Sequence, residues 1–120
     1  INSLLFSSFS VSKIEVEGEE FCELVATVNS IPVGYLLLTK VLNPIINQYY
    51  CIVDYVCVSS EYQNNGVGKA LLEEANRIAK EQSAIYLQLT CSTFRVAAHK
   101  LYESCGFVKR ESDIFRKEIV

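Results

Sequence analysis

A very apolar stretch that runs through a glycine-bearing turn into an amphipathic helix constrains this chain more than any other feature. Residues 48–58 (QYYCIVDYVCV) are mostly apolar at both the odd-numbered and the even-numbered positions, as expected of a strand buried on both faces. The polar turn that follows contains Gly66 and Gly68. Apolar residues over 67–82 then recur at the i, i+3, i+4 spacing of one buried helix face, with the charged residues on the other face. The stretch predicts a strand, a tight turn and a helix.

The other segments predict strands and one more helix. Alternating and β-branched residues on both sides of the turn at residues 30–32 predict a hairpin. A second helix is expected to end at Gly106, because glycine is favoured just beyond helix ends. The expected strands cover 20–29, 33–41, 84–91, 107–109 and 114–120, and the second helix covers 94–105.

The predicted order β-β-β-α-β-α-β-β specifies an α/β domain with a mixed sheet. The strand–helix–strand part should be a right-handed parallel crossover. At 120 residues the chain has the length of one typical domain, so we expect residues 1–120 to form a single domain.

Charge and cysteine content exclude several classes of protein. The net charge of −3 argues against non-specific binding to nucleic acid, which needs a cationic surface. No stretch approaches the ~20 apolar residues of a membrane-spanning helix. An odd number of cysteines without a C-x-x-C pair predicts neither a disulfide framework nor a zinc site, so we expect reduced thiols, a cytoplasmic location and no metal. The cysteines are Cys22, Cys51, Cys57, Cys91 and Cys105.

The turn Gln63-Asn64-Asn65-Gly66-Val67-Gly68 has the character of an anion site. Glycines let the backbone approach a ligand closely. The helix that follows leaves its first N–H groups unpaired at the positive end of its dipole, where phosphate binds readily. The sequence is neither a Walker A loop nor a full G-x-G-x-x-G. A tight turn without a ligand and a site for another phosphate ligand, such as a nucleotide, stay open.

Two motifs resemble one family. Residues 56–72 (VCVSSEYQNNGVGKALL) are similar to the strand–Q/R-x-x-G-x-G/A–helix signature of the GNAT superfamily of acyl-CoA-dependent N-acetyltransferases. Residues 95–107 (RVAAHKLYESCGF) are similar to that family's A-x-x-x-Tyr-x-x-x-Gly-Phe segment. The resemblance covers about residues 20–110 and implies the GNAT fold and acetyl-CoA as co-substrate. It also implies transfer of the acetyl group to a primary amine by direct attack in a ternary complex.

The resemblance implies two cofactor-binding segments. Backbone N–H groups over 63–69 would hold the pyrophosphate of coenzyme A. The strand end at 56–58 would pair with the pantetheine arm, and one of its N–H groups would polarise the thioester carbonyl. Arg95 stands where many relatives have asparagine, and it would touch the cofactor or the acceptor unless it is a solvated helix charge. The implied cofactor-binding residues are Val56, Cys57, Val58, Gln63, Asn64, Asn65, Gly66, Val67, Gly68, Lys69 and Arg95.

Two residues are candidates for proton transfer. The resemblance implies that Tyr102 protonates the leaving thiolate, which suits a phenol of pKa about 10; a purely structural aromatic is the alternative. Asp54 is a lone carboxylate in an apolar strand, where desolvation would raise its pKa, so it is the candidate base. A structural carboxylate and a base acting through ordered water stay open. His99, the single histidine, is expected to be a surface or packing residue.

The residues before the predicted hairpin bear on the acceptor. The acidic stretch between Glu15 and Glu23 favours a cationic amine, either a small molecule or a peptide, and a homodimer is left open. The chain has no methionine and only about 20 residues before the predicted hairpin. We therefore expect a GNAT-like fold that is short at its N-terminus, with the acceptor-binding part reduced or missing. The alternative function is a non-catalytic acyl-CoA-binding or regulatory module of the same fold.

Overall fold

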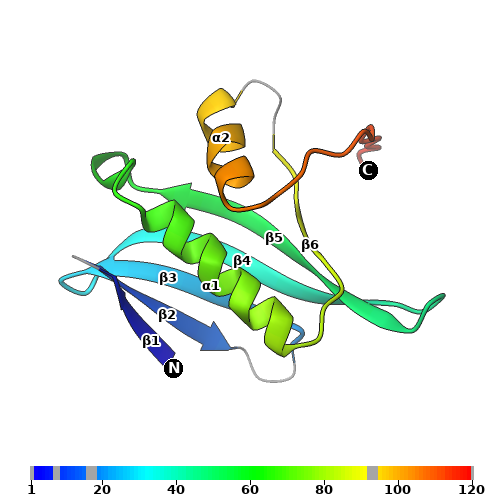
Figure 1. The fold of residues 1–120 in the computed structure, drawn as a ribbon, viewed down its shortest axis with the longest axis horizontal. Coiled ribbons are helices and arrows are strands. Elements are labelled where there is room, and N and C mark those ends of the chain that lie inside the picture. Colours follow the sequence, from blue (N-terminus) through cyan, green and yellow to red (C-terminus); the bar gives the residue numbers. More distant parts are fainter. Residues whose placement is uncertain (1, 7–8, 16–18, 92–94, 120) are drawn as a thin grey trace.

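The computed structural model describes residues 2–6, 9–15, 19–91 and 95–119. Figure 1 shows a twisted sheet with one long helix lying across it. The sheet has six strands in the order β1-β2-β3-β4-β5-β6; successive strands are antiparallel, except that β5 and β6 are parallel. This confirms the predicted mixed α/β fold. The elements are β1 (Asn2–Phe6), β2 (Phe9–Glu15), β3 (Phe21–Val28), β4 (Ile31–Asn43), β5 (Gln48–Val58), the 3-10 turn η1 (Ser60–Tyr62), α1 (Val67–Glu81), β6 (Leu87–Leu89) and α2 (Val96–Ser104).

The predicted central hairpin is confirmed as β3 and β4. Its turn is the dipeptide Asn29-Ser30, with φ of 49° and 65°. Positive φ at both central residues is typical of a type I′ turn, whose twist matches that of the flanking strands. The turn lies one residue earlier than the sequence predicts, and β4 continues two residues beyond the predicted end.

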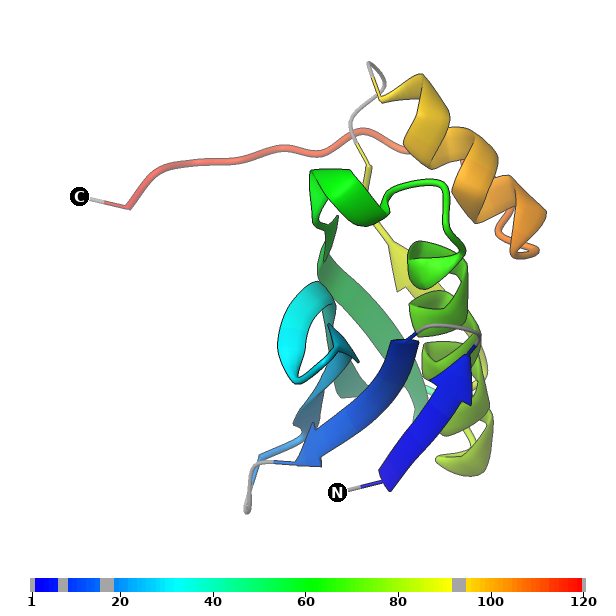
Figure 2. The ribbon, with the colours of Figure 1, turned by 90° about the vertical axis from the view of Figure 1, so that its left-hand side faces the viewer.

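Helix α1 covers one face of the sheet and forms the core with it. Its buried apolar side chains pack on those of β2 to β5, and the most deeply buried include Leu24, Leu36, Val53, Leu71 and Leu72. Both helices lie on the same side of the sheet, as Figure 2 shows. The side chains that face away from α1 are therefore covered by no described helix.

The C-terminal hairpin predicted over 107–109 and 114–120 is wrong. Residues 107–119 form neither helix nor strand. Phe107 packs against the core, and the chain then runs away from the body of the domain (Figure 2). Ile114, Phe115 and Ile119 are 74%, 93% and 90% exposed, so they have no surface on which to pack. A lone two-stranded hairpin is marginal in water, which explains why the β-prone pattern does not form one here.

Candidate functional site

Strand β5 contains a bulge near its C-terminal end. Leu37 of β4 lies opposite Asp54, whereas Tyr35 lies opposite Cys57, so β5 has one residue more than β4 between these pairs. Tyr55, inside that interval, has a φ of 59°. A bulge bends its strand and redirects backbone groups and side chains. The ladder is thus interrupted at the strand end predicted to receive the pantetheine arm.

Strands β5 and β6 part just beside this bulge. They pair only where residues 51–53 of β5 meet Leu87–Leu89, and beyond that point the two chains diverge (Figure 1). No described strand pairs with residues 54–58 along their outer edge. An unpaired strand edge offers N–H and C=O groups to an extended ligand. Val56, Cys57 and Val58, predicted to bind the cofactor arm, all lie on this edge.

The predicted anion turn lies between this strand end and α1. Gln63 Nε2 donates a hydrogen bond of 3.2 Å to the Val58 carbonyl, which ties the turn to β5. Asn64 and Gly66 have φ of 66° and 84°. The first amide of α1 that bonds back to the turn is that of Ala70, to the Gly66 carbonyl at 3.0 Å. The three amides before it, those of residues 67–69, have no partner within the helix.

The two glycines of the turn serve different purposes. A Cβ added to Gly66 would meet nothing within 4 Å, so the space above the turn is open and glycine is needed there for its positive φ. A Cβ added to Gly68 would lie 3.0 Å from Leu101 Cδ2. The second glycine therefore allows α2 to pack on the first turn of α1. The sequence predicted only a close approach of a ligand at this glycine.

Tyr102 lies in α2 and packs into the core on the face of the sheet that α1 covers. Its side chain is buried, and its ring meets that of Phe107 edge to face with the centroids 6.1 Å apart. Burial raises the pKa of the Tyr102 hydroxyl; the charge of Cys91 raises it further and that of Arg95 lowers it. Cys91 follows β6 by two residues, so Tyr102 lies near the C-terminal end of β6. The phenol is protonated at neutral pH.

Arg95 immediately precedes α2 and is exposed. It precedes the helix that contains Tyr102, and its positive charge lowers the pKa of Tyr102, against the larger rise that burial causes. Asp54 is half-buried and follows Val53, whose side chain points into the core. Successive strand residues point to opposite faces, so Asp54 lies on the face away from α1. Tyr102 packs into the core on the α1 side, so Tyr102 and Asp54 lie on opposite faces of the sheet.

The face away from α1 also holds residues that the sequence argument missed. The Tyr35 hydroxyl donates a 3.1 Å hydrogen bond to Glu23 Oε1. Burial and this hydrogen bond raise the pKa of Tyr35, and the charges of Glu23, Cys57 and Tyr55 add to the effect. Tyr35 and Cys57 also line an open, largely apolar cavity of about 320 Å³ at the ends of β4 and β5. Only the alternation of β4 could have indicated Tyr35, and nothing in the sequence marked Tyr55.

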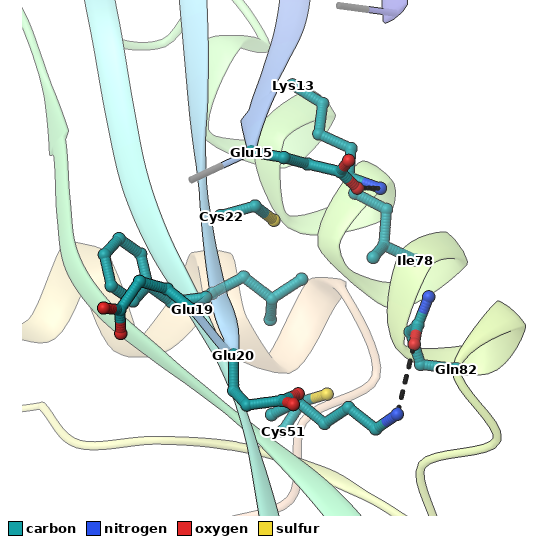
Figure 3. A pocket seen from close by; sticks show the side chains of 11 residues that line it. Lys13, Glu15, Glu19, Glu20, Cys22, Cys51, Ile78 and Gln82 are labelled. Atoms are coloured by element: carbon teal, nitrogen blue, oxygen red, sulfur yellow. Dashed lines mark hydrogen bonds and ion pairs between the residues drawn. The ribbon is translucent and has the colours of Figure 1, made fainter. Parts of the chain in front are cut away.

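A second cavity, of about 310 Å³, lies at the other end of α1 and contains none of the predicted site residues. Figure 3 shows charged side chains around it and two thiols at its floor. Lys13 is paired with Glu15 at 2.6 Å, and Lys40 Nζ donates to Gln82 Oε1 at 3.2 Å. Burial raises the pKa of both floor thiols, Cys22 and Cys51.

Two further observations concern metal ions and membranes. Within the described ranges, no three His, Cys, Asp or Glu side chains are grouped so as to hold a metal ion. Neither described helix has the length and apolar character needed to cross a membrane.

Comparisons with known proteins agree with this geometry. N-acetyltransferase family 8 member 3 of Rattus norvegicus is 30% identical over 88 residues, which are 73% of this chain and 39% of that protein. Human N-acetyltransferase 8 is 28% identical over 105 residues, 88% of this chain and 46% of that protein. The chain thus spans less than half the length of these curated relatives.

The fold agrees with a solved structure as well. An aminoglycoside acetyltransferase from an uncultured soil metagenomic sample superposes with a TM-score of 0.81 at 19% identity, covering 87% of this chain and 69% of that one. At this identity the likeness shows the fold alone. The family model described as "Acetyltransferase (GNAT) family" matches residues 6–107, which include the strand end, the glycine turn and Tyr102. The chain therefore belongs to the acetyltransferase (GNAT) family.

Proposed function

We propose that this chain transfers an acetyl group from acetyl-CoA to a primary amine, by direct attack of the amine in a ternary complex. The observation that carries the proposal is the parting of β5 and β6 beside the open N-terminus of α1, and it is supported by Tyr102, which packs into the core on the same face of the sheet. The amine nitrogen forms a bond to the thioester carbonyl carbon and the carbon–sulfur bond breaks. The products are an acetamide and coenzyme A.

The turn and the strand edge suit the two ends of acetyl-CoA. The unpaired amides of residues 67–69 and the dipole of α1 favour the pyrophosphate, and the open space above Gly66 leaves it room. The outer edge of β5 up to Cys57, before the Val58 carbonyl that Gln63 occupies, suits the amide-bearing pantetheine arm, which can pair as an added strand. An N–H group at the bulge would polarise the thioester carbonyl as negative charge develops on its oxygen.

The proton balance assigns one task to each predicted catalytic residue. Tyr102, protonated at neutral pH because burial raises its pKa, gives its proton to the departing thiolate. Asp54, on the opposite face, accepts the proton that the amine must lose, directly or through water. Arg95 lies near Tyr102 and is placed to contact the cofactor or an anionic part of the acceptor.

Calorimetric titration with acetyl-CoA tests the first half of the proposal. Binding in the micromolar range is expected, and no binding at high micromolar concentration would contradict it. Coenzyme A release across a panel of primary amines tests the second half. Binding without any release would instead favour the non-catalytic acyl-CoA-binding or regulatory module.

A variant of the proposed acid separates chemistry from binding. Tyr102→Phe should lower kcat by about 10²- to 10⁴-fold while leaving the Kd for acetyl-CoA nearly unchanged. Tyr86→Phe is the matched control, because Tyr86 is half-exposed and stacks on Tyr50 at 5.0 Å, away from the gap. Equal losses of turnover and affinity in Tyr102→Phe would mean that Tyr102 is structural.

A further inference from the structure

Tyr55 has a backbone conformation that its side chain does not favour. Its φ of 59° lies in the left-handed region, which costs a residue with a Cβ roughly 1–2 kcal/mol. A bulky residue there is a true outlier. Glycine or asparagine would adopt this backbone conformation at a lower free-energy cost. Retained backbone strain is commonly associated with a functional site, which suggests that the Tyr55 side chain has a function.

The Tyr55 ring is available to a ligand. The residue is 74% exposed and takes no part in the hydrophobic core. Its place in the bulge is defined by its neighbours, because Asp54 lies opposite Leu37 on the face away from α1 and Val56 packs against the core. Tyr55 therefore lies in the bulge and outside the core under α1, at the point that receives the acetyl group in the proposed reaction.

The surroundings of Tyr55 favour a cation. Strands β3, β4 and β5 contain three charged residues, Glu23, Lys40 and Asp54. Lys40 lines the cavity next to α1, where it donates to Gln82, so the charges on the outer face of these strands are both negative. Asp54 directly precedes Tyr55 in β5, and Tyr35, which bonds Glu23, lies opposite Cys57 two residues further on. An exposed aromatic ring in such a negative field attracts a positive charge through its π face.

The charge bound by Tyr55 cannot be that of the reacting amine. That amine must lose its proton before its nitrogen can attack the thioester carbon. An ammonium group held against the ring must therefore be a different group of the acceptor. This step rests on the proposed function, since it assumes that the amine attacks at the bulge.

We propose that Tyr55 is a specificity-determining residue, whose ring binds a second positive charge of the acceptor and so selects amines that carry one. Glu23 and Asp54 supply the negative potential, and the bulge holds the ring at the edge of the gap. The acceptor class is a primary amine with a further cationic group a few bonds away. The strain at Tyr55 is the cost of placing an aromatic ring there.

Two amines of equal length test this inference. Protein saturated with coenzyme A is titrated calorimetrically with 1,4-diaminobutane and with 4-amino-1-butanol, which lacks the second charge. The wild type should bind the diamine about tenfold more tightly, within the range of cation–π interactions. Tyr55→Leu should reduce this preference to less than about threefold, whereas Tyr55→Phe should retain most of it because the ring is kept. Tyr49→Leu, at the far end of β5, is the control and should retain it fully.

The strain itself gives an independent readout. Tyr55→Gly should raise the Tm by about 3 °C, because glycine adopts positive φ without cost, and should abolish the preference for the diamine. Equal affinities of the wild type for the two amines would overturn the inference. So would a preference that survives in Tyr55→Leu, or one lost equally in Tyr49→Leu. The titrations require no turnover, so they distinguish a failure of this inference from a failure of acetyl transfer.

Discussion

A Cβ placed on Gly34 of β4 would lie 2.7 Å from Cγ1 of Val67, the first residue of α1. This contact is closer than carbon atoms tolerate, so the missing side chain of Gly34 sets how near the start of α1 lies to the sheet. Gly34 also pairs with Val58, the last residue of β5. One close approach thus fixes the helix start relative to the strand edge of the candidate site.

Gly34→Ala should therefore destabilise the domain by overpacking, by about 1–3 kcal/mol, as measured by urea unfolding. Gly34→Ala/Val67→Ala should be more stable than the two single changes predict, because the shortened side chain relieves the clash. Additive changes in the free energy of unfolding in this double-mutant cycle would show that the two residues do not interact sterically.

Gly66 and Gly106 form a matched pair for the anion turn. Their φ values are 84° and 90°, and an added Cβ would meet nothing within 4 Å at either position. Each change to alanine should cost about 1 kcal/mol of stability through the left-handed backbone alone. Only Gly66→Ala should also raise the Kd for acetyl-CoA, by about tenfold or more, because its methyl group fills the space proposed for the pyrophosphate. Equal affinities of the two variants would place the pyrophosphate elsewhere.

The thiols should differ strongly in reactivity. Cys57 is exposed, while Cys22 and Cys51 are 6% and 1% exposed and have raised pKa values because they are buried. Alkylation by iodoacetamide at pH 8, followed by mass spectrometry, should modify Cys57 at least about tenfold faster, since only the exposed thiolate reacts without local opening. Saturating acetyl-CoA should protect Cys57 if the pantetheine arm lies along residues 56–58. Unchanged labelling of Cys57 in saturating acetyl-CoA would contradict that placement.

Sequence patterns predicted the central hairpin, β5 and both helices, because each of these elements has a strong period or a clear terminal signal. These patterns failed where contacts between residues far apart in the sequence determine burial or strand length. The polar periodicity of α1 places Glu74 on the solvent face, yet it is 5% exposed and paired with Arg77. The predicted strand over 84–91 shortens to Leu87–Leu89, because β6 separates from β5 after Leu89.

The candidate site was predictable only in part. The glycine turn and Tyr102 could be predicted because each belongs to a short sequence motif. The bulge depends on the relative register of β4 and β5, which no local pattern encodes, so Tyr55 could not be found in this way. Asp54 could be named as a lone carboxylate in an apolar strand, but not assigned to the face opposite Tyr102.

The pH dependence of turnover tests the proposed acid. Burial raises the pKa of Tyr102 above the ordinary value of 10.0. A group whose pKa is raised in the folded protein contributes stability that is fully present below its unfolded pKa and is lost as the pH rises through the folded pKa. Tyr102 should therefore stay protonated up to about pH 10. Its contribution to the free energy of unfolding should be retained over the same range.

The kcat profile should accordingly show no decline between about pH 7 and pH 9.5 that is due to Tyr102. Its descending limb should begin above pH 10, and Tyr102→Phe should lose that limb together with most of the turnover. Circular dichroism over the same range separates loss of the acid from alkaline unfolding. A descending limb near pH 8 that persists in Tyr102→Phe would assign the titrating group elsewhere and contradict the proposed role of Tyr102.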